Sequence, residues 1–247
     1  MLAGRPRGGQ PTVVASFRPV RLTLCLLTWN EIDGCRHDVP RLPLDRFEEV
    51  YAVDGGSTDG TSEYLASVGI RVYRQEVSGY NAAYLAAFQR CGTDALLMFH
   101  PKGSIDPATV LEFRPWLERG ADLVIASRLL AGGANEEDDR LLKPRKWFVA
   151  GLGRLAALLW KRQGPAIRDV LHGYRAMRRD AFFAISPLPT GVSMDLEMVV
   201  RGYKKRLRLV EFPVQERQRL KGATRFKALP TGRKLLRYVW FELGRKE

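Results

Sequence analysis

Four polar residues, His100, Lys102, Ser104 and Asp106, follow an uninterrupted apolar run in residues 95–107 (ALLMFHPKGSIDP). Such a run between turn-forming residues is typical of a buried strand of a parallel sheet. In open α/β sheets, ligands bind just beyond the carboxyl ends of these strands. We therefore expect the loop that carries His100, Lys102 and Asp106 to form part of an active site, with Lys102 and Asp106 as candidate catalytic residues.

A second group of residues suits an anionic ligand. Arg128 stands just past another apolar run, residues 121–126, so its guanidinium can reach the same edge of the sheet and take part in catalysis. Arg219, Thr224 and Arg225 follow in R-x-x-x-x-T-R spacing. Guanidinium groups and a hydroxyl match a phosphate monoester, because arginine supplies paired hydrogen-bond donors. The alternative for this group is a solvated basic loop.

A third group lies in the sequence VDGGSTDGT, which follows another apolar segment. Asp54 can accept hydrogen bonds, while Gly56 and Ser57 let the backbone turn and approach a ligand closely. An ordinary turn whose Thr58 or Asp59 caps the following helix has the same composition. Both interpretations place this loop at the end of a strand.

The elements that must position these groups alternate regularly in the first half of the chain. Strands are expected at 21–28, 49–53, 70–73, 95–99 and 121–126, and helices at 61–68, 79–90 and 107–118. Residues 29–44 are expected to form a loop broken by prolines. Strands that alternate with helices of about ten residues indicate βαβ units and a mostly parallel sheet.

The second half continues with expected strands at 169–177 and 207–210 and a helix at 193–201. Basic amphipathic helices are expected at 146–162 and 229–243, a composition that suits either a membrane interface or a core-facing helix. We expect a disordered tail over 1–20, one α/β domain over 21–228 and a C-terminal amphipathic helix within 229–247.

The charge of the chain is unevenly distributed. The 247 residues carry a net charge of +13, but residues 1–139 have a net charge of −5 and residues 140–247 one of +18. This asymmetry indicates an anionic partner for the second half. Nucleic acid is not the expected partner, because the basic half contains no recognisable nucleic-acid module. An anionic membrane surface and phosphate groups remain as candidate partners of the basic half.

Six segments recur together and in this order in one protein family: LLTWNE (26–31), VDGGSTDGT (53–61), residues 79–99, Ala126-Ser127-Arg128, DVLHGYR (169–175) and EFPVQERQRLKGATRF (211–226). The chain resembles the inverting glycosyltransferases with the GT-A fold. It is similar in particular to the polyprenyl-phosphate sugar synthases, which include dolichyl-phosphate mannose synthase. The resemblance covers nearly the whole of residues 22–225 and implies a Rossmann-like nucleotide-binding half.

The resemblance implies two binding sites. In the donor site, Trp29 can stack on the nucleotide base and Glu31 can hydrogen-bond its edge. An acceptor phosphate is largely ionised at neutral pH and needs no general base. The donor-binding candidates are Trp29, Glu31, Asp54, Gly56, Ser57 and Lys102, and the candidates for the lipid phosphate of the acceptor are Arg128, Arg219, Thr224 and Arg225.

The chain departs from this family at residues 100–102. The family has an Asp-x-Asp motif that holds Mg²⁺ or Mn²⁺, whereas this chain has His100-Pro101-Lys102. A protonated lysine repels a cation, so no metal ligand is assigned and Mg²⁺ or Mn²⁺ is disfavoured. Lys102 replaces the metal in the interpretation that we rank first. In the second, His100 and Asp106 hold a softer ion such as Mn²⁺, and in the third the protein binds ligand without catalysis.

The sequence thus predicts a glycosyltransferase that moves a sugar from a nucleotide donor to a polyprenyl phosphate with inversion. It is expected in the cytoplasm, peripherally bound to an anionic membrane surface; recruitment by a separate membrane-anchoring protein stays open. The alternatives are a soluble transferase with another acceptor and a catalytically degenerate protein that binds nucleotide sugar or acts as a scaffold.

Overall fold

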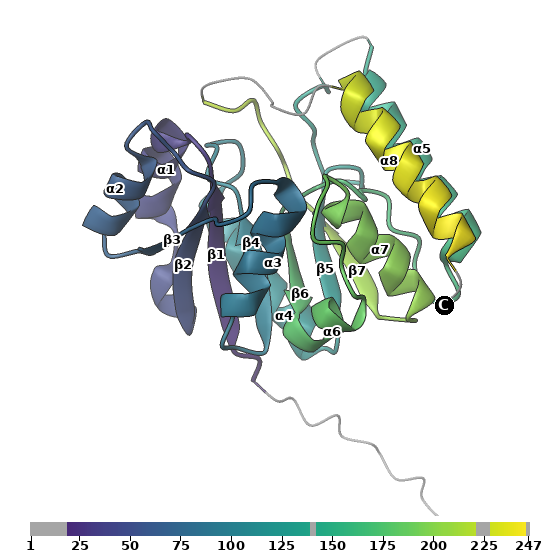
Figure 1. Ribbon diagram of the computed structural model, residues 1–247, viewed down its shortest axis with the longest axis horizontal. Coiled ribbons are helices and arrows are strands. Elements are labelled where there is room, and N and C mark those ends of the chain that lie inside the picture. The colour runs from purple at the N-terminus through teal and green to yellow at the C-terminus, as the bar shows by residue number, and fades with distance from the viewer. Residues whose placement is uncertain (1–18, 139–141, 221–227, 246–247) are drawn as a thin grey trace, which may run out of the picture.

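The computed structural model describes residues 19–138, 142–220 and 228–245. Seven strands form one sheet in the order β3-β2-β1-β4-β6-β5-β7 (Figure 1). β6 runs antiparallel to its neighbours β4 and β5, whereas the other strand pairs are parallel, which confirms the expected mostly parallel sheet. The strands are β1 (Leu22–Thr28), β2 (Glu49–Asp54), β3 (Arg71–Arg74), β4 (Ala95–Phe99), β5 (Leu123–Ser127), β6 (Arg175–Arg178) and β7 (Leu209–Pro213).

Helices cover both faces of the sheet. Leu24 and Leu26 of β1 join a core with α1, α2 and α4, whereas Cys25 and Leu27 join a core with the other helices. A sheet with two covered faces needs apolar residues at every position of its inner strands, which explains the unalternated runs in the sequence. The helices are α1 (Ile32–Asp38), α2 (Thr61–Ser67), α3 (Tyr80–Arg90), α4 (Phe113–Glu118), α5 (Pro144–Trp160), α6 (Arg179–Ala184), α7 (Met194–Lys204) and α8 (Ala228–Gly244).

The prediction that residues 29–44 form a loop is wrong. This segment contains α1 and two short 3₁₀ turns, Val39–Arg41 and Leu44–Arg46. Glycine lowers the intrinsic helix propensity of the segment. The fold uses Gly34 for close packing: a Cβ at this position would lie 2.0 Å from the carbonyl oxygen of Pro101. α1 therefore packs directly on the loop that carries Lys102.

The prediction of a strand over 169–177 is also wrong in its first residues, since β6 begins only at Arg175. Residues 168 and 169 instead donate their backbone N–H groups to the carboxylate of Glu211, at 2.9 and 2.8 Å. Because β6 is antiparallel, the segment before it lies at the same edge as the carboxyl ends of β4 and β5. This places Asp169 and His172 beside the expected active site.

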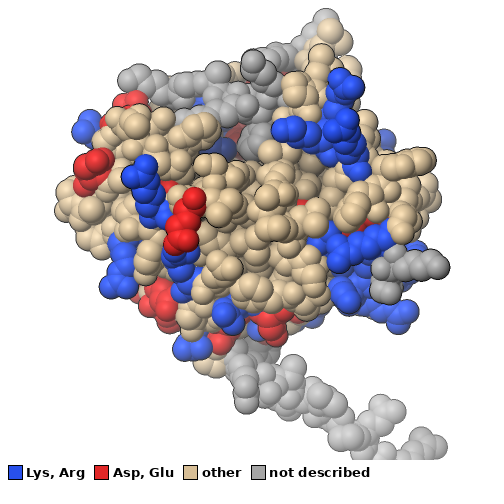
Figure 2. All heavy atoms as spheres, viewed as in Figure 1, with Lys and Arg blue, Asp and Glu red and all other residues tan. Residues whose placement is uncertain are grey.

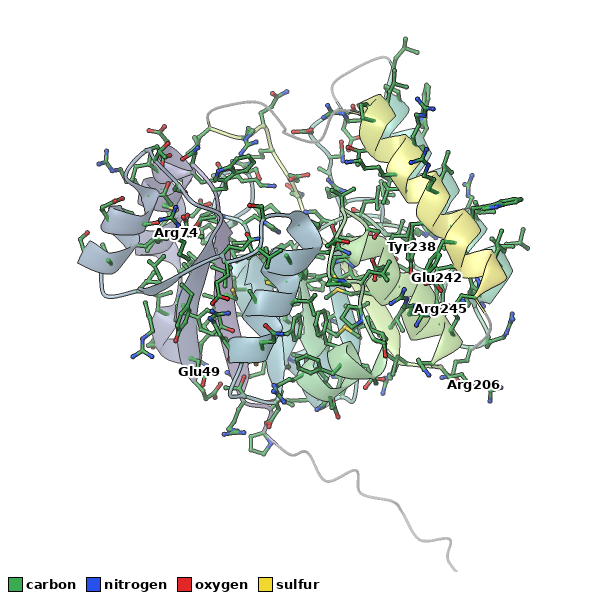
Figure 3. The ribbon with its side chains drawn as sticks, in the orientation of Figure 1. Glu49, Arg74, Arg206, Tyr238, Glu242 and Arg245 are labelled. Atoms are coloured by element: carbon green, nitrogen blue, oxygen red, sulfur yellow. The ribbon has the colours of Figure 1, made fainter. Side chains whose placement is uncertain are left out.

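The two expected basic amphipathic helices correspond to α5 and α8, which lie side by side at one end of the sheet (Figure 1). On the inner side of α8, Glu242 accepts hydrogen bonds from Arg201 and Lys204 of α7, both at 2.8 Å (Figure 3). Leu235 and Tyr238 of α8 belong to the same core as β4 and β5. No helix in the described ranges is long and apolar enough to cross a membrane.

Two glycines of α5 provide a test of this packing. A Cβ at Gly153 would lie 2.7 Å from the carbonyl oxygen of Arg168, whereas a Cβ at Gly151 would meet no atom within 4 Å. Gly153→Ala is expected to lower the free energy of unfolding by about 1–3 kcal/mol, because the backbone must shift. Gly151→Ala is expected to raise it by up to about 1 kcal/mol through helix propensity. Urea unfolding of both variants checks this, and equal effects would contradict the packing of α5 against residues 167–168.

Candidate active site

The loops after β1 and β2 are joined by side-chain hydrogen bonds. The Asp54 carboxylate is buried and accepts from the backbone N–H groups of Gly56 and Ser57 at 2.9 and 2.7 Å. Its other oxygen accepts from the hydroxyls of Thr28 and Ser57. Gly56 has φ +90°, a conformation that favours glycine. Asp54 therefore shapes this loop, and a direct contact with a nucleotide stays a prediction.

Two further residues complete this connection: Asn30, which the sequence interpretation did not assign, and Asp59, which it considered as a cap of the following helix. Asn30, with φ +51°, accepts a hydrogen bond from the backbone N–H of Thr58 at 2.7 Å. Asp59 accepts from the N–H groups of Ile32 and Thr61 at 3.1 and 3.0 Å. Their signal in the sequence is a polar residue within the loop that follows each of two parallel strands. They hold the first two loops in a fixed relation.

Trp29 lies at the rim of these loops. Its side chain packs over Gly55, where an added Cβ would lie 3.2 Å from the Trp29 Cβ, and the residue is 51% exposed. An indole with one broad accessible face can stack on a planar ring. The placement is compatible with the base-stacking role that the family resemblance implies.

The loop after β4 is held from two sides. The backbone N–H of Gly103 donates to Asp38 of α1 at 2.8 Å. From the other side, a segment that follows β7, residues 214–220, which we call the strap, donates backbone N–H groups to the carbonyls of Ser104 and Lys102 at 2.8 and 3.1 Å. Leu220 of the strap packs against Gly103. The strap therefore fixes its own side chains relative to Lys102.

Arg128 lies in a buried ion-pair network at the end of β5. Its guanidinium donates to both oxygens of Asp169 at 2.8 and 2.9 Å and to Glu216 of the strap at 2.9 Å. Burial favours the neutral acid, but Arg128 outweighs it and holds the pKa of Asp169 well below its usual range. Asp169 and Glu216 were not identified from the sequence. Arg128 is thus paired with two carboxylates.

Lys102 lies close enough to the Arg128 ion-pair network to interact electrostatically with it. Burial lowers the pKa of its ammonium group, while the nearby carboxylates of Glu216 and Glu31 act in the opposite direction. Arg128 and Arg219 are the neighbouring cations. The lysine is therefore partly withdrawn from solvent and surrounded by charged groups of both signs.

His100 carries a buried Nε2 atom with no hydrogen-bond partner among the described residues. Burial holds the pKa of His100 well below its usual range, and Lys102, His172, Arg175 and Arg219 act in the same direction. A neutral imidazole among so many positive groups is a poor site for a divalent cation. No cluster of three or more His, Cys, Asp or Glu side chains suited to a metal ion occurs in the described part of the chain. The residues present do not fit Mg²⁺ or Mn²⁺.

Arg219 connects the two predicted binding sites. Its terminal Nη2 lies 2.7 and 2.9 Å from the two carboxylate oxygens of Glu31. Both side chains are 16% exposed. Glu31 is a donor-site candidate and Arg219 an acceptor-site candidate, so the structure joins one member of each set.

The remaining candidates are less informative. Asp106 is exposed and caps the 3₁₀ turn Pro107–Glu112, where its carboxylate accepts from the N–H of Ala108 at 3.0 Å. A catalytic role for it stays a prediction. Thr224 and Arg225 lie outside the described residues, as does most of the expected tail 1–20. Val20, the last residue of that tail, is buried.

Comparison with known proteins gives relatives over most of the chain. Polyprenol monophosphomannose synthase of Mycolicibacterium smegmatis is 26% identical over 233 residues, which cover 85% of this chain and 83% of that protein. Dolichyl-phosphate hexose transferase of Haloferax volcanii is 27% identical, with 80% and 83% covered. Glycosyltransferase AglJ of Haloferax volcanii is 27% identical over 79% of this chain, but the match spans only 63% of that protein.

A solved structure shares the fold. Glucosyl-3-phosphoglycerate synthase from Mycobacterium tuberculosis, in complex with Mn²⁺, uridine diphosphate and phosphoglyceric acid, superposes with a TM-score of 0.71 and 17% identity, over 92% of this chain and 80% of that one. The family model described as Glycosyl transferase family 2 matches residues 26–185, more than half of the chain. The predicted family and fold are thereby confirmed: the chain belongs to glycosyl transferase family 2 and has the GT-A fold.

Proposed function

We propose that the protein transfers a sugar from a nucleotide-sugar donor to a polyprenyl phosphate, with inversion and without a metal ion. The observation that carries this proposal is the group of three cations, Lys102, Arg128 and Arg219, at the edge of the sheet where the family has its metal motif. The relatives named for polyprenol and dolichyl phosphate support the acceptor class.

The chemistry is a single displacement. An ionised oxygen of the acceptor phosphate attacks the anomeric carbon, forming a new C–O bond as the bond from that carbon to the nucleoside diphosphate breaks. The nucleoside diphosphate leaves with the bonding electrons, and attack from the opposite side inverts the anomeric centre. Because the acceptor is an anion, no proton has to be removed. The residues must instead stabilise charge on the leaving phosphate, which Lys102 is placed to do.

The direct test is to incubate the purified protein with UDP- and GDP-sugars and a short polyprenyl phosphate, and to detect the lipid-linked sugar by mass spectrometry. Formation of this product in excess EDTA supports the proposal. A parallel reaction with phosphoglycerate tests a soluble phosphorylated acceptor. Transfer only to phosphoglycerate would replace the acceptor assignment, and nucleotide binding without any transfer would favour a binding or scaffold protein.

We also propose that the protein binds peripherally to the cytoplasmic face of an anionic membrane through the outer side of α8. Leu229, Leu236, Trp240 and Leu243 are exposed at spacings of seven, four and three residues, which align them along one side of a helix. Lys and Arg side chains gather over this end of the molecule (Figure 2). Exposed Arg233, Lys234 and Arg237 accompany the apolar stripe, a combination that favours anionic lipid.

Trp240→Asp is expected to weaken binding to anionic vesicles by roughly tenfold or more, since burial of a large apolar side chain contributes about 1.5–3 kcal/mol. Trp240 is 79% exposed, so its replacement removes little packing within the protein. Val77→Asp, at an exposed apolar residue outside α5 and α8, is the matched control. Co-sedimentation with vesicles at low and high salt measures both variants. Equal binding of Trp240→Asp and the unmodified protein would contradict the interface.

A further inference from the structure

The Glu31–Arg219 ion pair presents a conflict between two ligands. The proposed function assigns Arg219 to an acceptor phosphate and Glu31 to a nucleotide, yet the two side chains pair with each other. A carboxylate and a phosphate monoester compete for the same guanidinium donors. The two groups cannot both hold the Arg219 Nη2 atom in its present geometry.

The carboxylates around Lys102 offset the positive charge that would attract a phosphate. The cations Lys102, Arg128 and Arg219 face the carboxylates Glu31, Asp169 and Glu216. Burial keeps the neighbouring His100 and His172 neutral by lowering the pKa of each. Among the described residues, these three positive and three negative groups sum to no net charge. A phosphate is therefore not attracted strongly until one carboxylate withdraws.

Glu31 is the carboxylate that can withdraw most readily. Asp169 is buried and accepts from the side chain and backbone of Arg128, and it also has Glu211 bound to its own N–H. Glu216 is fixed between Arg128, at 2.9 Å, and His172, at 4.0 Å. Glu31 lies on the rim loop before α1, and both of its carboxylate oxygens accept from Arg219.

We propose that the Glu31 carboxylate, paired with Arg219, occupies the position of the acceptor phosphate, and that its displacement couples the two substrates. A phosphate monoester replaces Glu31 on Arg219, beside Lys102. The released Glu31 carboxylate then becomes an acceptor of hydrogen bonds from the nucleotide. Each ligand thereby raises the affinity for the other. This inference rests on the proposed function, because it requires both a nucleotide and a phosphate acceptor.

Coupling of this kind is reciprocal and amounts to roughly fivefold or more in affinity. The dissociation constants of UDP and GDP are measured by calorimetry with and without saturating farnesyl phosphate. We expect farnesyl phosphate to tighten the binding of the nucleotide that binds, and this nucleotide to tighten farnesyl phosphate by the same factor. Inorganic phosphate in a parallel titration distinguishes a requirement for the lipid from one for phosphate alone: coupling by either anion supports the exchange at Arg219.

Glu31→Gln is the decisive variant, since a neutral amide holds the guanidinium less strongly. It is expected to bind farnesyl phosphate several-fold more tightly when nucleotide is absent, and to lose the coupling. Glu76→Gln removes an exposed carboxylate that pairs with Arg90 at 3.7 Å, outside the site, and is expected to retain the coupling. Circular dichroism confirms that both variants are folded.

Two results would overturn the inference. One is nucleotide binding that is unchanged or weakened by farnesyl phosphate in the unmodified protein. The other is coupling that persists in Glu31→Gln. In both cases nucleotide still binds, so these results do not refute the proposed sugar transfer, which the product assay tests separately. If neither UDP nor GDP binds, the proposed function fails, and the coupling fails with it.

Discussion

Lys102→Ala is expected to lower the turnover of sugar transfer by roughly a hundred- to a thousandfold, the loss typical of removing one group that stabilises developing charge. Lys102 lies among charged groups at the carboxyl end of β4, where withdrawal from water strengthens its effect. Donor affinity should fall much less, because the charge on the leaving phosphate is greatest in the transition state. Turnover and donor affinity are measured separately in excess EDTA.

Lys102→Arg is the matched control, since it preserves the positive charge. Burial lowers the pKa of Lys102, so activity of the unmodified protein should decline as the ammonium loses its proton at high pH. A guanidinium does not lose its proton in this range. The decline should therefore be absent in any activity that Lys102→Arg retains. Activity that requires metal in the unmodified protein, or that survives Lys102→Ala, would refute the role of Lys102.

Asp169→Ala is expected to lower the free energy of unfolding by about 3–5 kcal/mol, because it removes two of the three hydrogen bonds that the Arg128 guanidinium donates to carboxylates. Asp169→Asn keeps the shape of the side chain and isolates the effect of the charge. Asp94→Ala breaks an exposed pair with Arg21 and should cost at most about 1 kcal/mol. Chemical denaturation of the three variants checks these values.

The pH dependence gives the same prediction a second readout. Arg128 holds the pKa of Asp169 below its usual value near 3.8, despite burial. The stability that Asp169 contributes is then fully present above the unfolded-state pKa and is lost as the pH falls through the folded-state pKa. Asp169→Asn should flatten this part of the acid unfolding profile. Equal losses for Asp169→Ala and Asp94→Ala at neutral pH would show that the buried pair is not needed.

Much of the fold could be predicted because local patterns determine it. The apolar runs that form β1, β4 and β5 are buried along their whole length, as expected for inner strands of a sheet covered on both faces. α1 was missed because Gly34 weakens a helix locally, and its close contact with Pro101 is visible only in three dimensions. The direction of β6 is likewise a tertiary property, since a strand has the same side-chain pattern whichever way it pairs.

The candidate site was predicted in its location but not in its connections. Lys102 and Arg128 could be placed at one edge because both follow apolar strands. Asp169 and Glu216 were missed because a single carboxylate in a polar segment has the same appearance whether it is solvated or buried against arginine. The Glu31–Arg219 pair joins residues 188 positions apart, and no local pattern predicts such a contact.

The antiparallel strand β6 has a consequence for synthesis of the chain. β4 is wholly apolar and lies in the sheet between β1 and β6, so residues 175–178 must be present before its second edge is covered. Before these residues have been synthesised, the amino half of the nascent chain exposes an unpaired hydrophobic strand edge. Such an edge can pair with strands of other chains. Expression of the amino half alone is therefore expected to favour aggregation, because the two halves of the sheet are separable in sequence but not in folding.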